Sequence, residues 1–442
     1  MDRLAVELNA LLSETVAGRL LSDFGRRIFF PKGIISQSAE AKQRAHRANA
    51  TIGMACSNGI PLRLSGIARH FPLLSETESV AYAPTTGVED LRGFWKEQIL
   101  EKNPSLAAAD FSTPVIVPGI TAGISFAAEL FVDSGQNVIA SAPCWDNYAL
   151  IFEQRRGARV RGTAFLDEAA GALNIDAIAR AVRDEAKSGS VRVILNFPNN
   201  PAGYAPSAAE AAALSSLLLE TAQGGADVLV LCDDAYFGLF YEDDTCKQSL
   251  FGSLAAGHER LLAVKIDGPT KEDYVWGLRL AALTFGCKGF AAGQYEALIK
   301  KLAGVIRSSV SCANTPSQYA YLHACRAEGT ETQREKQQFF ERLKKRYLAV
   351  KRFIATHEAP PQLVPLPFNS GYFMSFRTIG VGAEQIRTAL LENYGVGTIA
   401  ISENCLRLAF SSLNEDDIDE VYSALYKTAA ALGGSACGGG AG

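Results

Sequence analysis

Short apolar runs alternate with helix-forming stretches through the middle of the chain. The runs cover residues 113–117, 137–140, 191–195, 228–232, 261–266 and 280–285, and each ends in a polar or glycine-containing turn. Apolar runs separated by helices in this way are typical of strands buried on both faces of a parallel sheet. The pattern therefore predicts an α/β core that binds its ligands at the carboxyl ends of the strands.

A different pattern follows the last of these runs. Helix formers and charges fill residues 316–357, with a break near Gly329, and they predict helices that leave the core. Shorter segments come after them, and they read as strand, helix and strand before a final helix: 371–377, 385–394 and 406–413. These elements predict a second, smaller α+β unit.

The two patterns divide the chain into two domains. We expect a large domain of residues 62–322 and a small domain of residues 1–61 and 323–442, in which the glycine-rich residues 432–442 form a flexible tail. Apolar residues near the N-terminus recur at helical spacing and predict a helix that packs on the rest of the chain: Leu4, Leu8, Leu11, Leu12 and Val16.

Composition narrows the class of protein only slightly. The 442 residues are 48% hydrophobic and 20% charged with a net charge of -4, which suits an ordinary globular protein and gives no electrostatic case for binding nucleic acid or a membrane. The N-terminal segment is acidic from its second residue and lacks an unbroken apolar core, so neither a signal peptide nor a membrane span is expected. Nine scattered cysteines without a CxxC pair predict reduced thiols of a cytoplasmic protein and no metal site.

Polar residues of distinct chemistry follow three of the predicted strands. The run 191–195 leads into an asparagine- and proline-rich turn at residues 196–203, and the run 228–232 leads into Asp233 and Tyr236. Beyond the run 261–266 comes Lys271, and Arg279 follows it by eight residues. Each feature alone indicates no more than a loop or the rim of a sheet.

Together and in this order, the motifs resemble those of the class I/II aminotransferases related to aspartate aminotransferase. These are enzymes of fold type I that use pyridoxal 5'-phosphate (PLP). The resemblance extends from about Tyr82 to Arg407. It implies a large domain with a mostly parallel, seven-stranded sheet flanked by helices, and a smaller α+β domain.

The resemblance also implies roles around the cofactor's ring. Lys271 would anchor PLP as an imine and then shuttle a proton between the substrate's Cα and the cofactor. Asp233 would keep the pyridine nitrogen protonated so that the ring accepts electrons, and Asn200 and Tyr236 would bond the phenolic oxygen. Lys265 is the rival lysine, but it lies inside an apolar run rather than after it.

A second set of residues is expected to hold the phosphate. Gly119, Ile120 and Thr121 follow a strand and open a helix, where backbone N–H groups bind anions. Thr270 and Arg279 join them, although residues 268–270 lack the family's usual serine and so one hydroxyl is missing. Tyr82 resembles the tyrosine that reaches the phosphate of the neighbouring subunit, which implies a homodimer with shared active sites.

The remaining residues of the resemblance concern the substrate. Trp145 would stack on the ring, and both Trp145 and Asn200 would lie near the substrate. Without this context, a tryptophan is more often part of a core. Arg407 would bind the substrate's α-carboxylate, the alternative being a surface arginine on an edge strand. Gly53 is a weaker candidate near the substrate, and Arg307 either reads a substrate side chain or is a solvated helix residue.

Three functions remain open on the sequence. The first is an aminotransferase that moves an amino group from an L-amino acid to a 2-oxo acid such as 2-oxoglutarate by a ping-pong mechanism. The second is another PLP reaction on the same fold, a carbon–sulfur β-lyase or a cyclopropane-forming synthase. The third is a PLP-binding regulator without turnover, which should carry a DNA-binding module for which the resemblance leaves no room.

Overall fold

The computed structural model describes residues 1–30, 33–106, 109–327 and 329–437. At its centre lies a seven-stranded sheet in the order β4-β12-β11-β10-β9-β5-β6. The strands are β4 (Val115–Val117), β5 (Asn137–Ala142), β6 (Arg159–Ala164), β9 (Ser190–Asn196), β10 (Asp227–Asp233), β11 (Leu261–Asp267) and β12 (Ala281–Gly286). β12 pairs antiparallel with both of its neighbours, while β6, β5, β9, β10 and β11 pair in parallel. The predicted α/β class and the mostly parallel sheet are confirmed.

All six apolar runs form strands of this sheet, because their side chains are buried on both faces. Along β10, Leu229 and Leu231 belong to one apolar cluster, whereas Val228 and Val230 belong to the other. The first cluster includes α8 (Ile120–Phe131) and α13 (Ala292–Ser309), and the second includes α9 (Ile175–Ala186), α10 (Ala208–Gln223) and α11 (Leu250–Leu254). The seventh strand, β6, is an edge strand whose polar sequence gave no apolar run.

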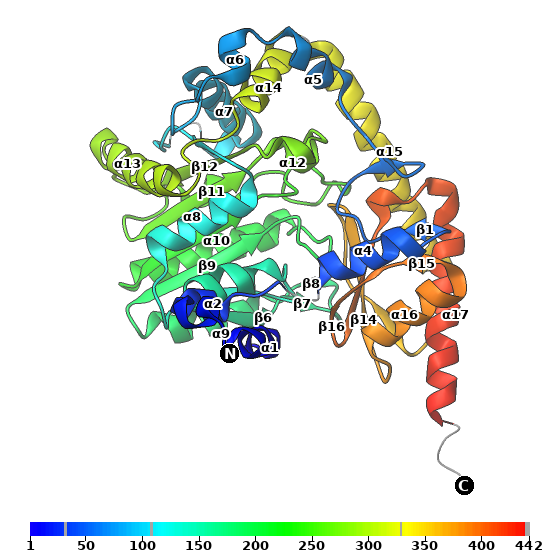
Figure 1. Cartoon of the computed structure of the whole chain (residues 1–442). Helices are drawn as coiled ribbons and strands as arrows, with labels where there is room; N and C mark the ends of the chain where they lie inside the picture. The colour runs from blue at the N-terminus through cyan, green and yellow to red at the C-terminus, as the bar shows by residue number, and fades with distance from the viewer. Residues whose placement is uncertain (31–32, 107–108, 328, 438–442) are drawn as a thin grey trace.

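A smaller unit lies beside the large sheet (Figure 1). Its antiparallel four-stranded sheet has the order β13 (Leu363–Pro365), β14 (Phe373–Thr378), β17 (Cys405–Ala409), β16 (Ile399–Ser402). The unit also contains α4 (Ile34–Arg44), α16 (Ala383–Tyr394), α17 (Ile418–Cys437), and the parallel pair β1 (Ala48–Asn49) and β15 (Val396–Gly397). The predicted strand, helix, strand and final helix are all present, so the smaller α+β unit is confirmed.

One long helix, α15 (Gly329–Thr356), runs between the two units (Figure 1). Near its start it lies close to a group of helices: α5 (Ser65–His70), α6 (Glu76–Val80), α7 (Glu89–Lys102) and α14 (Thr315–Ala327). Further along it packs on α17 of the smaller unit. Two short hairpins, β2 (Cys56–Ser57) with β3 (Ile60–Pro61) and β7 (Leu166–Asp167) with β8 (Ala172–Leu173), complete the strands.

The structure differs from the predicted division in three places. The first three helices lie on the large unit and not on the small one (Figure 1): α1 (Arg3–Leu12), α2 (Val16–Leu20) and α3 (Asp23–Arg27). Helix α3 packs there on η3 (Ala149–Arg155), a π-helix. Helix α14 continues through the predicted boundary at 322/323. Helix α17 continues to Cys437, past the predicted start of the flexible tail at residue 432, and residues 438–442 lie outside the described part. Residues 432–437 include Gly433 and Gly434 and are poor helix formers, but such a segment extends an existing helix more easily than it would start one.

The predicted N-terminal helix forms as α1, which ends at Leu12, and Val16 begins α2. The predicted packing holds only in part. Helix α1 packs on α2 and α3 and buries Ala5, but Leu8, Leu11 and Val16 are 47%, 79% and 62% exposed. Helical spacing shows that apolar side chains share a face, and it does not show what covers that face.

Two further features bear on function. Across the described ranges, no helix is both long enough and apolar enough to cross a bilayer. Nor do three or more His, Cys, Asp or Glu side chains come together as a metal-binding group in that part of the chain.

Candidate active site

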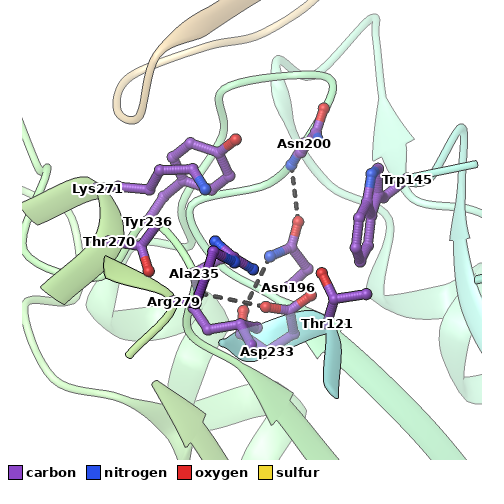
Figure 2. Close-up of a pocket in the computed structure, with 11 residues that line it drawn as sticks. Thr121, Trp145, Asn196, Asn200, Asp233, Ala235, Tyr236, Thr270, Lys271 and Arg279 are labelled. Carbon is purple, nitrogen blue, oxygen red and sulfur yellow. Dashed lines mark hydrogen bonds between the residues drawn. The ribbon is translucent and has the colours of Figure 1, made fainter. Parts of the chain in front are cut away.

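A pocket with about 520 Å³ of empty space, including the part open to solvent, lies at the carboxyl ends of β9 and β10 (Figure 2). It brings together most of the residues predicted from the motifs: Ile120, Thr121, Trp145, Asn200, Asp233, Tyr236, Thr270, Lys271 and Arg279. Asn196 and Ala235 also line it and were not predicted. Residues far apart in the sequence thus form one pocket where a parallel sheet offers its ligand site.

Asp233, the last residue of β10, is the buried acid of the pocket. Its side chain accepts hydrogen bonds from the Tyr148 hydroxyl at 2.5 Å and from the Ala235 N–H at 3.2 Å. Asn196 donates to its backbone carbonyl at 2.9 Å, which ties the end of β9 to the end of β10 (Figure 2). Burial raises the pKa of Asp233 to about 6, although the hydrogen bond from Tyr148 opposes this shift.

Lys271 provides the amine of the pocket. It lies half-buried on α12 (Pro269–Glu272), and its Nζ is 5.2 Å from the centre of the Tyr236 ring. Burial and the positive charge of Arg279 lower its pKa to about 8, against the opposing effect of Asp233. A lysine with this pKa is partly neutral near physiological pH, so it can act as a nucleophile or a base.

Lys265 occupies a different environment. It is 1% exposed and forms ion pairs with Asp234 and, at 3.2 Å, with Asp267. Burial acts to lower its pKa, but these two carboxylates outweigh burial and hold the pKa above its ordinary value. Lys265 is therefore a protonated structural partner, in contrast to Lys271.

The opposite end of the pocket is suited to an anion. Helix α8 begins after Gly119, and no side chain caps its N-terminus. The N–H groups of its first turn therefore form no hydrogen bond with a capping side chain. Gly119 has a φ of 94°, and a Cβ placed there would lie 2.3 Å from Nη2 of Arg279. Any other residue would push this guanidinium away. A helix N-terminus beside an arginine is a typical phosphate-binding arrangement.

Arg407 lies on β17, between β14 and β16, and it is 2% exposed. The alternative of a surface arginine on an edge strand is therefore wrong. Its guanidinium donates to Asn200 Oδ1 at 2.9 Å and to the Thr51 carbonyl at 3.2 Å. Its Nε has no hydrogen-bond partner within the described residues. A buried donor without a partner is costly, and a bound carboxylate would satisfy it.

The loop that carries Asn200 meets the smaller unit very closely. Gly203 has a φ of 76°, and a Cβ placed there would lie 1.9 Å from the Phe373 carbonyl oxygen. Ser375 on β14 also donates to the Pro201 carbonyl at 2.8 Å. The glycine of this motif is required because two backbones touch.

Five predicted residues are not among those that line the pocket: Gly119 and Arg407, described above, and Gly53, Tyr82 and Arg307. Gly53 is beside the pocket, since a Cβ placed there would lie 3.9 Å from the Tyr236 hydroxyl. Tyr82 is 91% exposed, and Arg307 is exposed near the end of α13. Neither of the latter two lines the pocket of its own chain.

The family model of the class I and II aminotransferases matches residues 73–425. The chain belongs to this family. This aminotransferase is 24% identical to an aspartate aminotransferase of Sulfurisphaera tokodaii over 77% of this chain and 80% of that protein. It is 26% identical to a probable N-acetyl-LL-diaminopimelate aminotransferase of Bacillus subtilis over 75% of this chain and 77% of that protein. The resemblance inferred from the motifs is confirmed.

Solved structures share the fold. An aminotransferase from Anaerococcus prevotii superposes with a TM-score of 0.81 at 21% identity, and the match covers 91% of this chain and 98% of that chain. A kynurenine aminotransferase from Pyrococcus horikoshii gives 0.77 at 16% identity, covering 94% and 98%. At these identities the likeness concerns the fold and not the substrate.

Aminotransferases of this family depend on PLP, and the residues of the pocket fit that cofactor. The anion-binding end suits its phosphate, and the buried acid Asp233 suits its pyridine nitrogen. The partly neutral amine of Lys271 suits its aldehyde. The predicted cofactor and the predicted class of enzyme, a PLP-dependent transaminase, are confirmed.

Tyr148 was missed from the sequence, and its hydrogen bond leads to a prediction. The residue lies three positions after Trp145, in a segment already of interest, but only the fold shows that its hydroxyl reaches Asp233. Tyr148→Phe should raise the pKa of Asp233 by about one unit, because a hydrogen bond to a charged group contributes about 1.5 kcal/mol. As the pH falls, Asp233 would therefore lose its carboxylate form at a higher pH in the variant than in the wild type.

A fluorescence titration of the cofactor-free protein with PLP at several pH values checks this prediction. In the wild type, the affinity for PLP should weaken as the pH falls through about 6. In Tyr148→Phe, the same loss of affinity should occur at a higher pH. Tyr295→Phe, which removes a hydroxyl bonded to the Asp110 and Cys287 carbonyls, is the matched control. Identical acid profiles for Tyr148→Phe and the wild type would contradict the role given to Tyr148.

Proposed function

We propose that this aminotransferase passes the amino group of an L-amino acid to 2-oxoglutarate by a ping-pong mechanism. The observation that carries the proposal is the combination, in one place, of a lysine with a lowered pKa, a buried acid and an anion-binding helix end. The aspartate aminotransferases among the relatives support a 2-oxo acid as the acceptor.

The predicted residues in and beside the pocket have proposed parts in holding the cofactor. Gly119, Ile120 and Thr121 would bind the phosphate with Arg279 and Thr270, and Asp233 would bind the ring nitrogen. Asn200 and Tyr236 would bond the phenolic oxygen, and Trp145 would cover one face of the ring. When bound, the cofactor takes up the donor's amino group and accepts the electron pair that is released at Cα.

Lys271 would move the proton of the reaction. Its Nζ lies at the wall of the pocket, and its pKa of about 8 allows it to take a proton from Cα and to return one. The buried carboxylate of Asp233 would stabilise positive charge on the ring throughout. Both groups depend on the dry surroundings of the pocket for their shifted pKa values.

Arg407 would orient the donor. Its guanidinium is buried, already fixed by Asn200 and Thr51, and retains an Nε without a partner in the described part of the chain. A carboxylate held by such a fork has little freedom to rotate, so the bond from Cα to its hydrogen is kept in one direction. Gly53 leaves room for the substrate beside Tyr236.

The complete enzyme would be a homodimer with shared active sites. Large apolar side chains are exposed in the segment before α7: Leu73 at 72%, Val80 at 84% and Tyr82 at 91%. Exposed apolar side chains suit a partner's surface, and Tyr82 could then reach the phosphate in the neighbouring subunit. Arg307 as a reader of the substrate side chain and a cytoplasmic location remain predictions.

A panel of amino acids tests the function. The purified protein with PLP is incubated with each donor and 2-oxoglutarate, and glutamate is measured. At least one donor should yield glutamate together with its own 2-oxo acid, and half-reactions without acceptor should stop after one turnover. Failure of every donor, with release of ammonia and pyruvate from cystathionine, would instead support the β-lyase.

A further inference from the structure

Four charged side chains meet beside the turn that carries Lys271. Glu272 accepts hydrogen bonds from Lys102 at 2.8 and 3.0 Å and from Lys336 at 2.9 Å. Asp273 pairs with Lys336 at 2.7 Å and accepts a hydrogen bond from the Tyr321 hydroxyl at 2.8 Å. We call Lys102, Glu272, Asp273 and Lys336 the α12 ion cluster.

The cluster is shielded and balanced in charge. Its side chains are 33%, 14%, 10% and 19% exposed in chain order, and two carboxylates face two ammonium groups. Lys102, Glu272 and Asp273 also line a cavity, together with Tyr321, that is separate from the pocket of Lys271. Because the charges cancel, the cluster can hold the turn from behind without imposing a net charge beside Lys271.

The turn needs such support. Helix α12 has four residues, far fewer than an isolated helix needs for stability, so contacts with other elements fix its position. Tyr372 of the smaller unit donates to the Lys271 carbonyl at 2.7 Å. The cluster holds the two residues that follow Lys271, and it does so from α7 and α15.

Helix α15 also contacts the smaller unit. Arg346, ten residues after Lys336, donates to the carbonyls of Ser411 and Cys56, the latter at 2.6 Å. One helix therefore contacts both the turn of Lys271 and the unit whose sheet carries Arg407. This arrangement can keep the proton-transferring amine and the carboxylate-binding arginine in a fixed relation.

We infer that the residues of the α12 ion cluster are positioning residues of the transamination reaction, which fix the turn of Lys271 and attach it to α15. The inference rests on the proposed function in that Lys271 must act as the base. None of the four would touch the substrate or the cofactor.

Two variants that change the cluster's charge in opposite directions test the inference. Glu272→Gln leaves one ammonium in excess, and Lys336→Met leaves one carboxylate in excess. Glu185→Gln is the matched control for the first, since Glu185 is 13% exposed and is bonded by Arg161 and Asn137 away from the pocket. Lys345→Met, at an exposed position of the same helix, is the control for the second.

The first measurement uses the cofactor-free protein. The rate at which acetic anhydride labels Lys271 is followed against pH by mass spectrometry of the peptide, which gives the pKa of this lysine. In both variants we expect the pKa to rise from about 8 toward the ordinary 10.5, because a loosened turn lets water reach the amine. An excess charge alone would shift the pKa in opposite directions in the two variants.

The second measurement uses the holoenzyme, well below the melting temperature of each variant. Both variants should lower kcat by about 10 to 100-fold with KM changed less than about threefold, since a misplaced base slows chemistry more than binding. The controls should keep the wild-type kcat and the wild-type pKa of Lys271.

Other outcomes would overturn the inference. A lower melting temperature with unchanged kcat and unchanged labelling would show that the cluster serves stability alone, and opposite pKa shifts would show a purely electrostatic effect. If the wild type transaminates no donor, the proposed function fails, yet the labelling experiment still decides whether the cluster positions Lys271.

Discussion

Lys271→Ala should lower kcat for transamination by at least about 10⁴-fold, because the residue is both the proposed anchor of the cofactor and the proposed base. The structure supports this choice by environment. Lys271 lines the pocket with a pKa lowered to about 8, so a fraction of the amine is neutral at pH 7. Alanine removes the amine and leaves no other lysine at the pocket wall among the described residues. A steady-state assay with the best donor gives the comparison.

Lys265→Met is the matched control for this prediction. Lys265 is also buried, but it pairs with Asp234 and Asp267 and does not line the pocket. Removing one member of a buried ion pair costs about 3 to 5 kcal/mol, so this variant should melt at a lower temperature. Its folded fraction should nevertheless keep kcat within about tenfold of the wild type, because no reacting group is lost. The reverse ranking of the two variants would contradict the role given to Lys271.

Asp233→Asn should lower kcat by about 10³-fold, the loss typical of removing a preorganised electrostatic group. The amide is nearly the same size and can keep hydrogen bonds to its neighbours, but it carries no negative charge to stabilise a protonated ring. The activity of the variant should stay low at every pH. In the wild type, the contribution of Asp233 should be lost as the pH falls through its pKa of about 6, since the carboxylate form is the required one. The difference between the two proteins should therefore shrink at acid pH.

The next residue in the chain supplies the control. Asp234 is buried like Asp233, but its carboxylate accepts from the Ser249 hydroxyl at 2.6 Å and pairs with Lys265. Asp234→Asn should therefore destabilise the fold and leave the kcat of the folded enzyme close to that of the wild type. Calorimetry and steady-state kinetics on both variants separate the two effects. Equal losses of kcat would contradict the different roles of these consecutive acids.

Much of the large sheet could be predicted because its strands are buried on both faces. A strand such as β10 then shows as a continuous apolar run, and the polar residues that end it point to the ligand site. β6 escaped prediction because an edge strand faces water and Arg159 and Arg161 alternate along it. The identity of the site residues came from motif order, since no single motif was specific.

Contacts between distant segments could not be predicted from the sequence. Nothing in the spacing links Tyr148 to Asp233, or Lys102 and Lys336 to Glu272, because these pairs meet only once the helices pack on the sheet. The same limit applies to the N-terminal helices. Their apolar periodicity predicts a common face, but which surface they lie on depends on the tertiary fold.

The proposed bond between Lys271 and the cofactor can be tested directly by one measurement. The holoenzyme is reduced with borohydride, digested, and mapped by mass spectrometry to find which lysine carries the cofactor's mass. The modified peptide should contain Lys271. Modification at Lys265, or at any lysine outside the pocket with Lys271 unmodified, would contradict it.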